Sequence, residues 1–428
     1  MKKLLVYAEL KGIRHLVGTI CGNGPDDAVF RYEESYLADP KAAPVSVSLP
    51  LTEKTYSPLE TRTFFEGLLP EGFTRRSVAH WMHADAEDYV SILMGLGREC
   101  LGALQLLPEG AEEIEPSYEP ISDHQVAALA REGATTSAQI VTKTHLSLTG
   151  ASGKVGLYYD SGEGVWYLPK GTAPSTHIVK QSHVRLNGIV ANEQLCLLTA
   201  RKLGIRVPES FVINLGHGND EEVLFATERY DRRITPDSVL ISGLPAPMRL
   251  HQEDFAQALG MSSASKYEDL PKHYLRQMFT LLRSCSSDPI NDQLMLWDAL
   301  VFDFLIGNAD AHLKNVSLLY NEDMTSKRLA PLYDIVSTSV YESGTRDMAV
   351  FFGGKCSLDE ISRSDIMAAA DEAGLGRRMA IRRLDALCEH FEEALNEAAV
   401  ELEPLEPTLI ARLRSQILAT GGYIRICG

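Results

Sequence analysis

The chain has 428 residues, of which 45% are hydrophobic and 23% charged, and its formal net charge is −17. This length predicts two or three domains with a sizeable hydrophobic core. No run reaches the roughly 18 consecutive apolar residues of a membrane-spanning helix, and the N-terminus reads as a strand rather than a signal peptide. The acidic charge argues against direct nucleic-acid binding as the main task, because such binding depends on Lys and Arg contacts to phosphates.

The cysteines are odd in number and scattered, and no two of them form a C-x-x-C pair. Such a set predicts neither a disulfide framework nor a zinc site, and a reducing, cytoplasmic location fits it best. The seven are Cys21, Cys100, Cys196, Cys285, Cys356, Cys388 and Cys427.

Residues 1–110 are predicted to form a small β-rich domain. Strand-like runs occur over 6–20 and 30–49, and helical spacing of apolar residues covers 77–95. The chain next becomes acidic and proline-bearing, in P-E-G-A-E-E-I-E-P-S-Y-E-P at 108–120, where the segment 111–140 begins. This composition predicts a linker between two domains.

Small residues cluster over 145–158, H-L-S-L-T-G-A-S-G-K-V-G-L-Y, between two strand-like runs. Backbone N–H groups in such a turn can approach phosphates, although an ordinary hairpin turn explains the segment equally well. Lys180 closes the β-branched run H-I-V-K, like the strand lysine that contacts nucleotide phosphates in kinases. Glu193 opens an amphipathic helix and could form the lysine–glutamate pair that orders a kinase site.

A further strand-like run over 223–227 leads into E-R-Y-D-R-R at 228–233. Backbone groups at this strand exit could hydrogen-bond an adenine ring, and a charged turn is the simpler alternative. From about residue 235 the pattern is mostly helical. Helices are predicted around 252–260, 272–284, 291–306, 363–373, 377–399 and 407–419.

One polar segment follows an apolar helical run that ends at Gly307 and Asn308, residue types that commonly terminate helices. This segment, N-A-D-A-H-L-K-N, carries Asp310 and Asn315 at the spacing of the kinase loop D-x-x-x-x-N. In that loop the Asp accepts a hydroxyl proton and the Asn oxygen holds a magnesium ion on the phosphates. A loop of capping residues is the alternative reading.

Downstream, residues 329–336 read L-A-P-L-Y-D-I-V, a short strand-like run with one acid, Asp334. A lone acid in an apolar run is costly unless it has a partner. Kinases need a second acid at this place to hold the metal that bridges the phosphates. Together, the two segments favour phosphoryl transfer over a purely structural role.

Taken as a whole, the sequence resembles the HipA-type serine/threonine kinases, the toxin half of bacterial toxin–antitoxin pairs. The resemblance runs over nearly the whole chain and depends on the order and spacing of many unusual segments. They are S-L-P-L, F-F-E-G-L-L-P-E, L-S-L-T-G-A-S-G-K, P-K-G-T-A-P-S-T-H-I-V-K, N-E-Q-L-C-L-L-T-A-R-K-L-G-I-R-V-P, E-R-Y-D-R-R, L-H-Q-E-D-F-A-Q-A-L-G, K-Y-E, I-G-N-A-D-A-H-L-K-N and L-A-P-L-Y-D-I.

The resemblance implies an α+β, two-lobed protein-kinase-like (phosphoinositide-kinase-like) fold with a β-rich N-terminal subdomain and a helical C-terminal lobe. The expected domains are the N-terminal domain (1–110), the linker (111–140), a kinase N-lobe with a glycine-rich loop (141–235) and a helical C-lobe (236–428).

The resemblance also implies roles for single residues in a site for ATP and Mg²⁺. Asp310 is expected as the catalytic base, and Asn315 and Asp334 as metal ligands. Ser147 aligns with the serine that the family autophosphorylates, although Thr149 and Ser152 offer other hydroxyls in the same loop. The nucleotide-binding residues are expected to be Thr149, Gly150, Ala151, Ser152, Gly153, Lys154, Lys180, Glu228, Tyr230, His312 and Lys314, with Glu193 as the supporting ion-pair partner.

The implied target is an aminoacyl-tRNA synthetase, with the glutamyl enzyme first, whose inactivation stops translation and leads to dormancy and persistence. The implied partner is a HipB-type helix-turn-helix antitoxin that binds operator DNA, so that DNA is contacted only indirectly. Two alternatives stay open: a catalytically weak corepressor, and a small-molecule or lipid kinase. The second arises because Asp310, His312 and Asn315 also match the phosphoinositide-kinase loop D-x-H-x-x-N.

Overall fold

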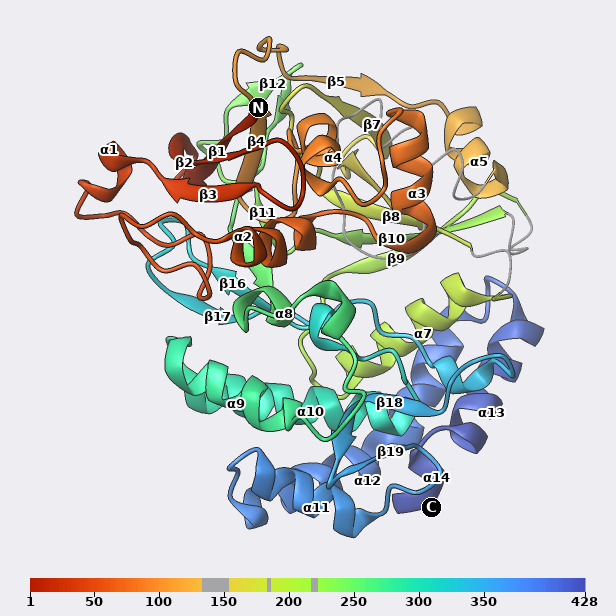
Figure 1. The fold of residues 1–428 in the computed structure, drawn as a ribbon. Helices are drawn as coiled ribbons and strands as arrows, with labels where there is room; N and C mark the ends of the chain where they lie inside the picture. Colours follow the sequence, from red (N-terminus) through yellow and green to blue (C-terminus); the bar gives the residue numbers. More distant parts are fainter. Residues whose placement is uncertain (133–153, 183–185, 217–221, 428) are drawn as a thin grey trace. The chain divides into compact units, whose positions relative to one another are not determined.

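The computed structural model describes the chain except for residues 133–153, 183–185, 217–221 and 428 (Figure 1). The chain divides into two compact units, each built from three stretches of sequence. The first unit comprises Met1–Gln181, Ala226–Ser263 and Leu318–Lys327, and the second comprises Ser182–Phe225, Ala264–Ser317 and Arg328–Gly428.

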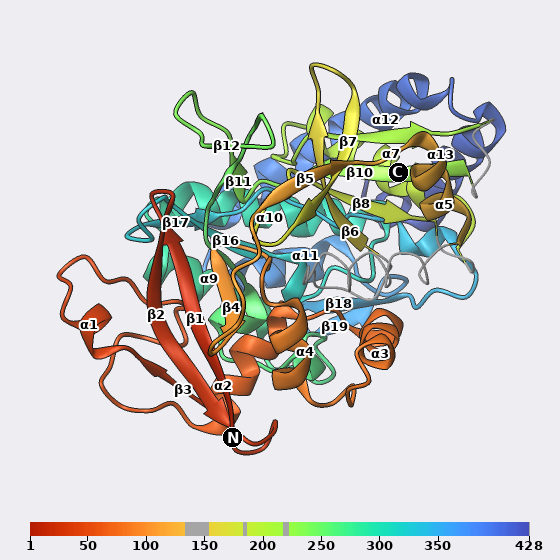
Figure 2. The ribbon, with the colours of Figure 1, turned by 90° about the horizontal axis from the view of Figure 1, so that it is seen from above.

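The first unit begins with a four-stranded antiparallel sheet of order β3-β2-β1-β4. Its long β1–β2 hairpin is prominent in Figure 2. The hairpin turns at Lys11 and Gly12, which both have positive φ, as the tight turns of such hairpins require. The strands are β1 (Lys2–Leu10), β2 (Ile13–Gly22), β3 (Val29–Tyr32) and β4 (Leu104–Pro108).

Short helices follow β3, namely α1 (Glu34–Leu37), α2 (Pro58–Phe65), α3 (Gly72–Trp81) and α4 (Tyr89–Leu96). The strand pairing predicted through residue 49 is therefore wrong after Tyr32. Tyr36 and Val45 are buried, but neither lies in a strand. The N–H of Val45 donates to the hydroxyl of Tyr32 at 2.9 Å and not to the backbone of a neighbouring strand.

A second sheet has six strands in the order β5-β7-β6-β8-β10-β9. Its strands are β5 (Ser117–Pro120), β6 (Lys154–Asp160), β7 (Val165–Lys170), β8 (His177–Gln181), β9 (Ser210–Asn214) and β10 (Val223–Glu228). The predicted linker at 111–140 thus contributes β5 and α5 (Asp123–Glu132). Tyr118 of β5 is buried against Tyr158 of β6, with the ring centroids 4.4 Å apart, and this apolar contact outweighs the acidic composition that suggested a linker.

The region after residue 235 also contains strands that the helical prediction missed. They have only two to six residues each, too few to show a hydrophobic period in the sequence. They are β12 (Leu240–Ile241), β13 (Leu244–Pro245), β14 (Met248–Arg249), β15 (Gln252–Asp254), β16 (Ser317–Tyr320), β17 (Lys327–Leu329), β18 (Asp347–Phe352) and β19 (Lys355–Ser357), and the two-residue strand β11 (Arg232–Arg233) lies just before this region.

The second unit is dominated by helices, which confirms the main helical segments expected from the sequence. The helix expected at 252–260 is shorter than predicted, because it is only α8 (Phe255–Ala258), a part of the first unit. The helices of the second unit include α7 (Ile189–Lys202), α9 (Tyr274–Cys285), α10 (Pro289–Ile306), α11 (Arg363–Glu372), α12 (Arg377–Leu402), α13 (Pro407–Thr420) and α14 (Tyr423–Ile426).

At the C-terminus, a disulfide joins Cys388 of α12 to Cys427, whose Cα atoms lie 5.3 Å apart. The sequence had predicted no such pairing. The two helices bring the cysteines together, since the rings of Phe391 and Tyr423 stack with their centroids 4.9 Å apart. Packing between helices leaves no local spacing signal for a pair of cysteines 39 residues apart.

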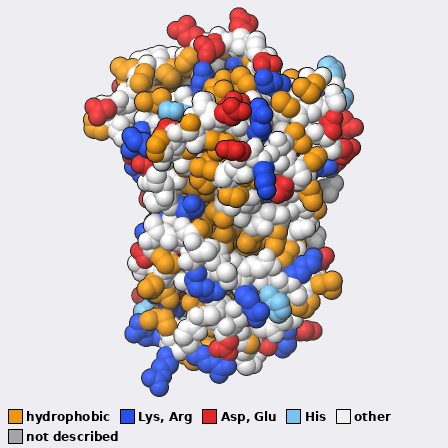
Figure 3. Space-filling view, turned by 60° about the vertical axis from the view of Figure 1, so that its left-hand side comes forward, with side chains coloured by type: hydrophobic (Ala, Val, Ile, Leu, Met, Phe, Trp, Pro, Cys, Tyr) orange, Lys and Arg blue, Asp and Glu red, His pale blue; other side chains and the backbone are white. Residues whose placement is uncertain are grey.

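None of the described helices is long and apolar enough to cross a membrane. On the face shown in Figure 3, acidic and basic side chains are interspersed among apolar ones. The excess of acidic residues therefore does not form a single patch on this face.

Candidate functional site

The polar loop that follows α10 starts at a glycine that the geometry requires. Gly307 has a φ of +71°, and its N–H donates to the carbonyl of Phe304 at 3.1 Å, which ends the helix. A Cβ at this position would lie 2.2 Å from the Oγ of Ser339. The helix end predicted from the sequence is thus confirmed, and both the backbone angle and the close neighbour explain the glycine.

Asn308 fixes the start of the loop to the end of the helix. Its Nδ2 donates to Oδ1 of Asp303 at 2.8 Å, and its Oδ1 accepts the N–H of Asp310 at 3.1 Å. The N–H of Ala309 donates to Oγ1 of Thr338 at 2.8 Å. The backbone that carries Asp310 is therefore held from two directions before any ligand is considered.

Asp310 and Asn315 are connected through the backbone of the loop. The Nδ2 of Asn315 donates to the carbonyl of Asp310 at 2.9 Å, and the N–H of His312 donates to the same carbonyl at 2.8 Å. Because the amide nitrogen of Asn315 is used in this way, its oxygen is the atom that can bind a cation. Lys314 and His312 are both buried in this loop.

Tyr267 contacts the candidate base, and sequence reasoning did not assign it to the site. Its hydroxyl donates to Oδ1 of Asp310, and its ring meets that of His312 edge-on, with the centroids 5.0 Å apart. The only signal in the sequence was the K-Y-E segment of the family resemblance, which assigned no role to this tyrosine. Its neighbour Glu268 anchors it by accepting the N–H of Lys272 at 2.9 Å and that of Phe351 at 2.9 Å.

The strand predicted for 329–336 is wrong, because β17 ends at Leu329 and Asp334 lies in the irregular segment that follows. Its φ is +59°, a left-handed conformation that is uncommon for any residue other than glycine. Such conformations persist only where the surroundings hold them, and they cluster at functional sites.

Asn315 and Asp334 line the same small cavity, together with Asp303 and Asn308. Its volume of about 10 Å³ is the space of a single water molecule. Carboxylate and amide oxygens are the ligands that Mg²⁺ prefers, and Mg²⁺ is commonly held by one or two carboxylates with substrate phosphates and water. In the part of the chain that the structure describes, no cluster of three or more His, Cys, Asp or Glu side chains offers a fuller metal cage. The donors present fit a magnesium ion.

Asp303, at the end of α10, is buried, and its carboxylate accepts from the neutral amide of Asn308. Burial raises the pKa of its carboxyl to about 7, although the amide of Asn308 partly opposes this by donating to it. Near neutral pH, this carboxyl therefore gains or loses a proton easily.

The residues expected to bind ATP also occur in the first unit. Lys180 is buried in β8, where it pairs with Lys154 of β6 in the antiparallel register. Glu228 ends β10 and is exposed, and the hydroxyl of Tyr230 donates to Oε1 of Gln252.

Some predicted contacts stay predictions. Lys180 belongs to the first unit, whereas Glu193, on α7, belongs to the second, so the structure gives no test of their ion pair. The loop residues Ser147, Thr149, Gly150, Ala151, Ser152 and Gly153 lie outside the described part of the chain.

Two family profiles match the sequence. The HipA N-terminal domain matches residues 10–107, and the HipA-like C-terminal domain matches residues 146–395. The second match alone covers more than half of the chain.

Two curated relatives align over most of their length. A putative kinase, Y4mE, of Sinorhizobium fredii is 34% identical over 389 residues, which is 89% of each chain. The serine/threonine-protein kinase toxin HipA of Shewanella oneidensis is 28% identical over 391 residues, covering 88% of this chain and 86% of the relative.

The fold agrees with a solved structure from Shewanella oneidensis, described as the toxin–antitoxin system HipA, HipB and its operator DNA complex. The match has a TM-score of 0.79 at 24% identity and covers 97% of this chain and 96% of the other. It confirms the predicted kinase-like α+β fold with a β-rich N-terminal part and a helical C-terminal part.

Proposed function

We propose that this chain, which belongs to the HipA family of kinase toxins, transfers the γ-phosphate of ATP to a serine or threonine hydroxyl of a protein. The observation that carries this proposal is the loop after α10. There Asn315 is hydrogen-bonded to the backbone of Asp310 and lines one cavity with Asp334. A base and two oxygen ligands on adjoining segments are the parts that phosphoryl transfer requires.

In this proposal Asp310 is the general base. The hydroxyl of Tyr267 holds Oδ1 of this carboxylate, and Oδ2 accepts the proton of the attacking hydroxyl. The hydrogen bonds of its backbone to Asn308 and Asn315 fix the segment from which this carboxylate projects. Positioning of this kind supplies much of the rate in phosphoryl transfer, because the protein forms no covalent intermediate.

Asn315 and Asp334 would hold Mg²⁺ through their side-chain oxygens. When bound, the metal ion neutralises charge that develops on the transferred phosphoryl group. Lys180 would contact the ATP phosphates, and the backbone of Glu228 and Tyr230 would receive the adenine. The loop of Thr149, Gly150, Ala151, Ser152, Gly153 and Lys154 would cover the phosphates.

The family resemblance also supports a target and a partner. We propose an aminoacyl-tRNA synthetase as the target, with the glutamyl enzyme first, and a helix-turn-helix antitoxin as the partner. The Shewanella oneidensis relative was solved with HipB and operator DNA. A net charge of −17 suits a protein that reaches DNA through such a partner. The match to the HipA N-terminal domain favours this reading over a lipid kinase.

Autophosphorylation at Ser147 would switch the enzyme off, with Thr149 and Ser152 as the other hydroxyls of the same loop. A phosphate adds about −1.5 to −2 charges. Beside the site of an anionic nucleotide, this charge would repel ATP.

The test is incubation of the purified chain with labelled ATP and Mg²⁺, beside an Asp310→Ala variant, followed by mapping of the label by mass spectrometry. Label on Ser147 that is absent from the variant is the expected result. Label on Thr149 or Ser152 would support the kinase activity but would move the proposed autophosphorylation site to that residue. Unphosphorylated protein that transfers no label to itself or to the glutamyl-tRNA synthetase would contradict the proposal and favour a corepressor.

A further inference from the structure

The strand exit proposed to bind adenine is held from one side by the backbone. The N–H of Arg229 donates to the carbonyl of Thr176 at 2.9 Å, just before β8. In an extended chain, the backbone groups of successive residues point to opposite edges. The groups of Glu228, the last residue of β10, therefore point away from Thr176, toward the edge where a base can be received. Tyr230 follows in a turn that the N–H of Arg232 closes by donating to the carbonyl of Arg229 at 3.1 Å.

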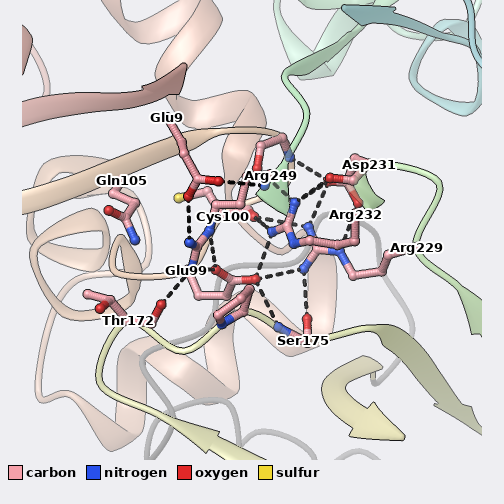
Figure 4. Close-up of polar contacts among 12 residues, drawn as sticks. Glu9, Glu99, Cys100, Gln105, Thr172, Ser175, Arg229, Asp231, Arg232 and Arg249 are labelled. Carbon is pink, nitrogen blue, oxygen red and sulfur yellow. Dashed lines mark hydrogen bonds and ion pairs between the residues drawn. The ribbon is translucent and has the colours of Figure 1, made fainter. Parts of the chain in front are cut away.

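Three acids and three arginines, all ionisable, meet behind this strand exit (Figure 4). Glu99 is at the centre, with its side chain only 2% exposed. It accepts from Arg229 Nη1 at 3.1 Å, from Arg232 Nη2 at 2.7 Å and from Arg249 Nη2 at 2.6 Å. The six members of this ion network are Glu9, Glu99, Asp231, Arg229, Arg232 and Arg249.

The ion network ties the strand exit to the segment that precedes β4 in the N-terminal domain. Asp231 binds Arg229 through Oδ2 at 2.8 Å, and the same oxygen accepts the N–H of Gly102 at 2.7 Å. Arg229 and Arg232 both donate to the carbonyl of Cys100, at 3.1 and 3.0 Å. The exit from β10 is thus fixed by residues that lie about 130 positions earlier in the chain.

The same ion network also holds the approach to β8, the strand of Lys180. Arg229 Nη1 donates to the Oγ of Ser175 at 2.9 Å, and Arg249 Nη2 donates to the carbonyl of Thr172 at 2.7 Å. Both strands that carry proposed ATP contacts in the first unit are therefore anchored to a single buried carboxylate, Glu99.

The charges in this ion network are balanced, with three acids against three arginines. Burial alone would raise the pKa of Glu99, but Arg232, Arg249 and Arg229 outweigh it and lower the pKa to about 2. Asp231 behaves in the same way, and its pKa is also about 2. Separating one partner from such a set leaves a buried charge without compensation, which strongly destabilises the fold.

We infer that the N-terminal domain is part of the nucleotide site: through Glu99 it positions the strand exit that receives adenine and the strand that carries Lys180. Glu99, Arg229 and Asp231 are positioning residues and do not touch the nucleotide. This inference rests on the proposed function, because it concerns how the same site holds ATP. It gives the N-terminal domain a role in nucleotide binding in every copy of the chain, whatever partner is bound.

The experiment compares kcat and KM for ATP and for GTP in the full chain and in Glu99→Gln. The amide lacks the negative charge that three arginines share, so the strand exit should shift while the loop of Asp310 stays intact. We expect KM for ATP to rise about tenfold and kcat to stay within about twofold. The preference for ATP over GTP should decrease, because the backbone at the exit of β10, which is proposed to bind the adenine, would be displaced.

Glu66→Gln is the matched control. Glu66 also bridges two arginines of the N-terminal domain, Arg62 at 2.9 Å and Arg75 at 2.8 Å, and it is not a member of the ion network around Glu99. It should keep the wild-type KM. If Glu99→Gln is recovered unfolded, Ser175→Ala carries the same test, because it removes only a neutral partner of Arg229.

An unchanged KM and an unchanged ATP preference in folded Glu99→Gln or Ser175→Ala would overturn the inference and leave the kinase intact. An equal rise of KM in Glu66→Gln would also overturn it, since the effect would then be general destabilisation. Absence of phosphoryl transfer in the wild-type chain, with or without a protein acceptor, would instead refute the proposed function.

Discussion

Two buried carboxylates in this chain, one in each unit, have opposite electrostatic surroundings. Glu99 accepts from three arginines and has a pKa of about 2, whereas Asp303 accepts from the neutral amide of Asn308 and has a pKa of about 7. Burial acts on both in the same direction, so the difference comes from charge compensation. The compensated carboxylate holds chain segments together. The uncompensated one lies at a cavity whose oxygen donors fit a cation.

The largest effect on phosphoryl transfer should come from a substitution in the cavity that Asn315 and Asp334 line. Asp334→Asn removes the one ionised ligand proposed for the metal, and we expect phosphoryl transfer to fall about 1,000-fold at a fixed Mg²⁺ concentration. Label transfer across a Mg²⁺ titration measures it. Asp359→Asn, at an exposed carboxylate paired with Arg346, is the control and should transfer label normally. Normal label transfer by Asp334→Asn would show that Asp334 is not a ligand of the metal ion.

Glu99→Ala tests the carboxylate whose charge is compensated by arginines. This change leaves three buried arginines with two acids, and losing one partner of a buried ion pair costs about 3–5 kcal/mol in the free energy of unfolding. Urea denaturation at pH 7 measures the loss. In the wild type, the contribution of Glu99 should be present above pH 4.5, its ordinary pKa, and be lost as the pH falls toward about 2. A loss below about 1 kcal/mol would show that the ion network is not tightly coupled.

Asp303→Asn should change the free energy of unfolding in the opposite direction, toward higher stability. A carboxyl whose pKa is raised from 3.8 to about 7 binds its proton more tightly in the folded state, so it destabilises the protein progressively as the pH rises through that window. Without nucleotide or metal, the variant should be more stable than the wild type at pH 8, by at most about 4 kcal/mol. Urea denaturation at pH 5 and pH 8 gives the comparison. A variant less stable at both values would mean that Asp303 is charged and compensated.

The smallest effect concerns Tyr267. Tyr267→Phe removes the hydroxyl that donates to Oδ1 of Asp310 but keeps the ring against His312. A hydrogen bond to a charged group contributes about 1.5–3 kcal/mol, so we expect kcat at saturating ATP to fall about tenfold. Tyr36→Phe removes a hydroxyl that donates to the carbonyl of Ala43 and should leave kcat unchanged. An equal kcat in both variants would show that the hydroxyl of Tyr267 does not help to position Asp310.

The loop that carries the proposed base, Asp310, could be predicted from sequence because its signals are local. A glycine ends an apolar helix, and Asp310 and Asn315 follow within one short segment. The structure agrees with this local reading, since α10 ends at Ile306 and the Asn315 amide reaches the Asp310 carbonyl.

The positioning groups could not be predicted because they are remote in sequence. Tyr267 lies 43 residues before Asp310, and Glu99 lies 130 residues before Arg229. A buried arginine in E-R-Y-D-R-R looks the same in sequence as a solvated one. The short strands after residue 235 and the pairing of β5 with β7 were missed for a similar reason, because tertiary contacts and not periodicity specify them.

The most direct test of the account is the rate of label transfer at saturating Mg²⁺ and ATP in the wild type, Asp310→Ala and Glu99→Gln. The account predicts that Asp310→Ala loses about 10²- to 10⁴-fold, because the general base is gone. Glu99→Gln should keep nearly the wild-type rate, because saturation compensates for weaker nucleotide binding. Wild-type transfer by Asp310→Ala would contradict the account, and so would a loss in Glu99→Gln as large as that in Asp310→Ala.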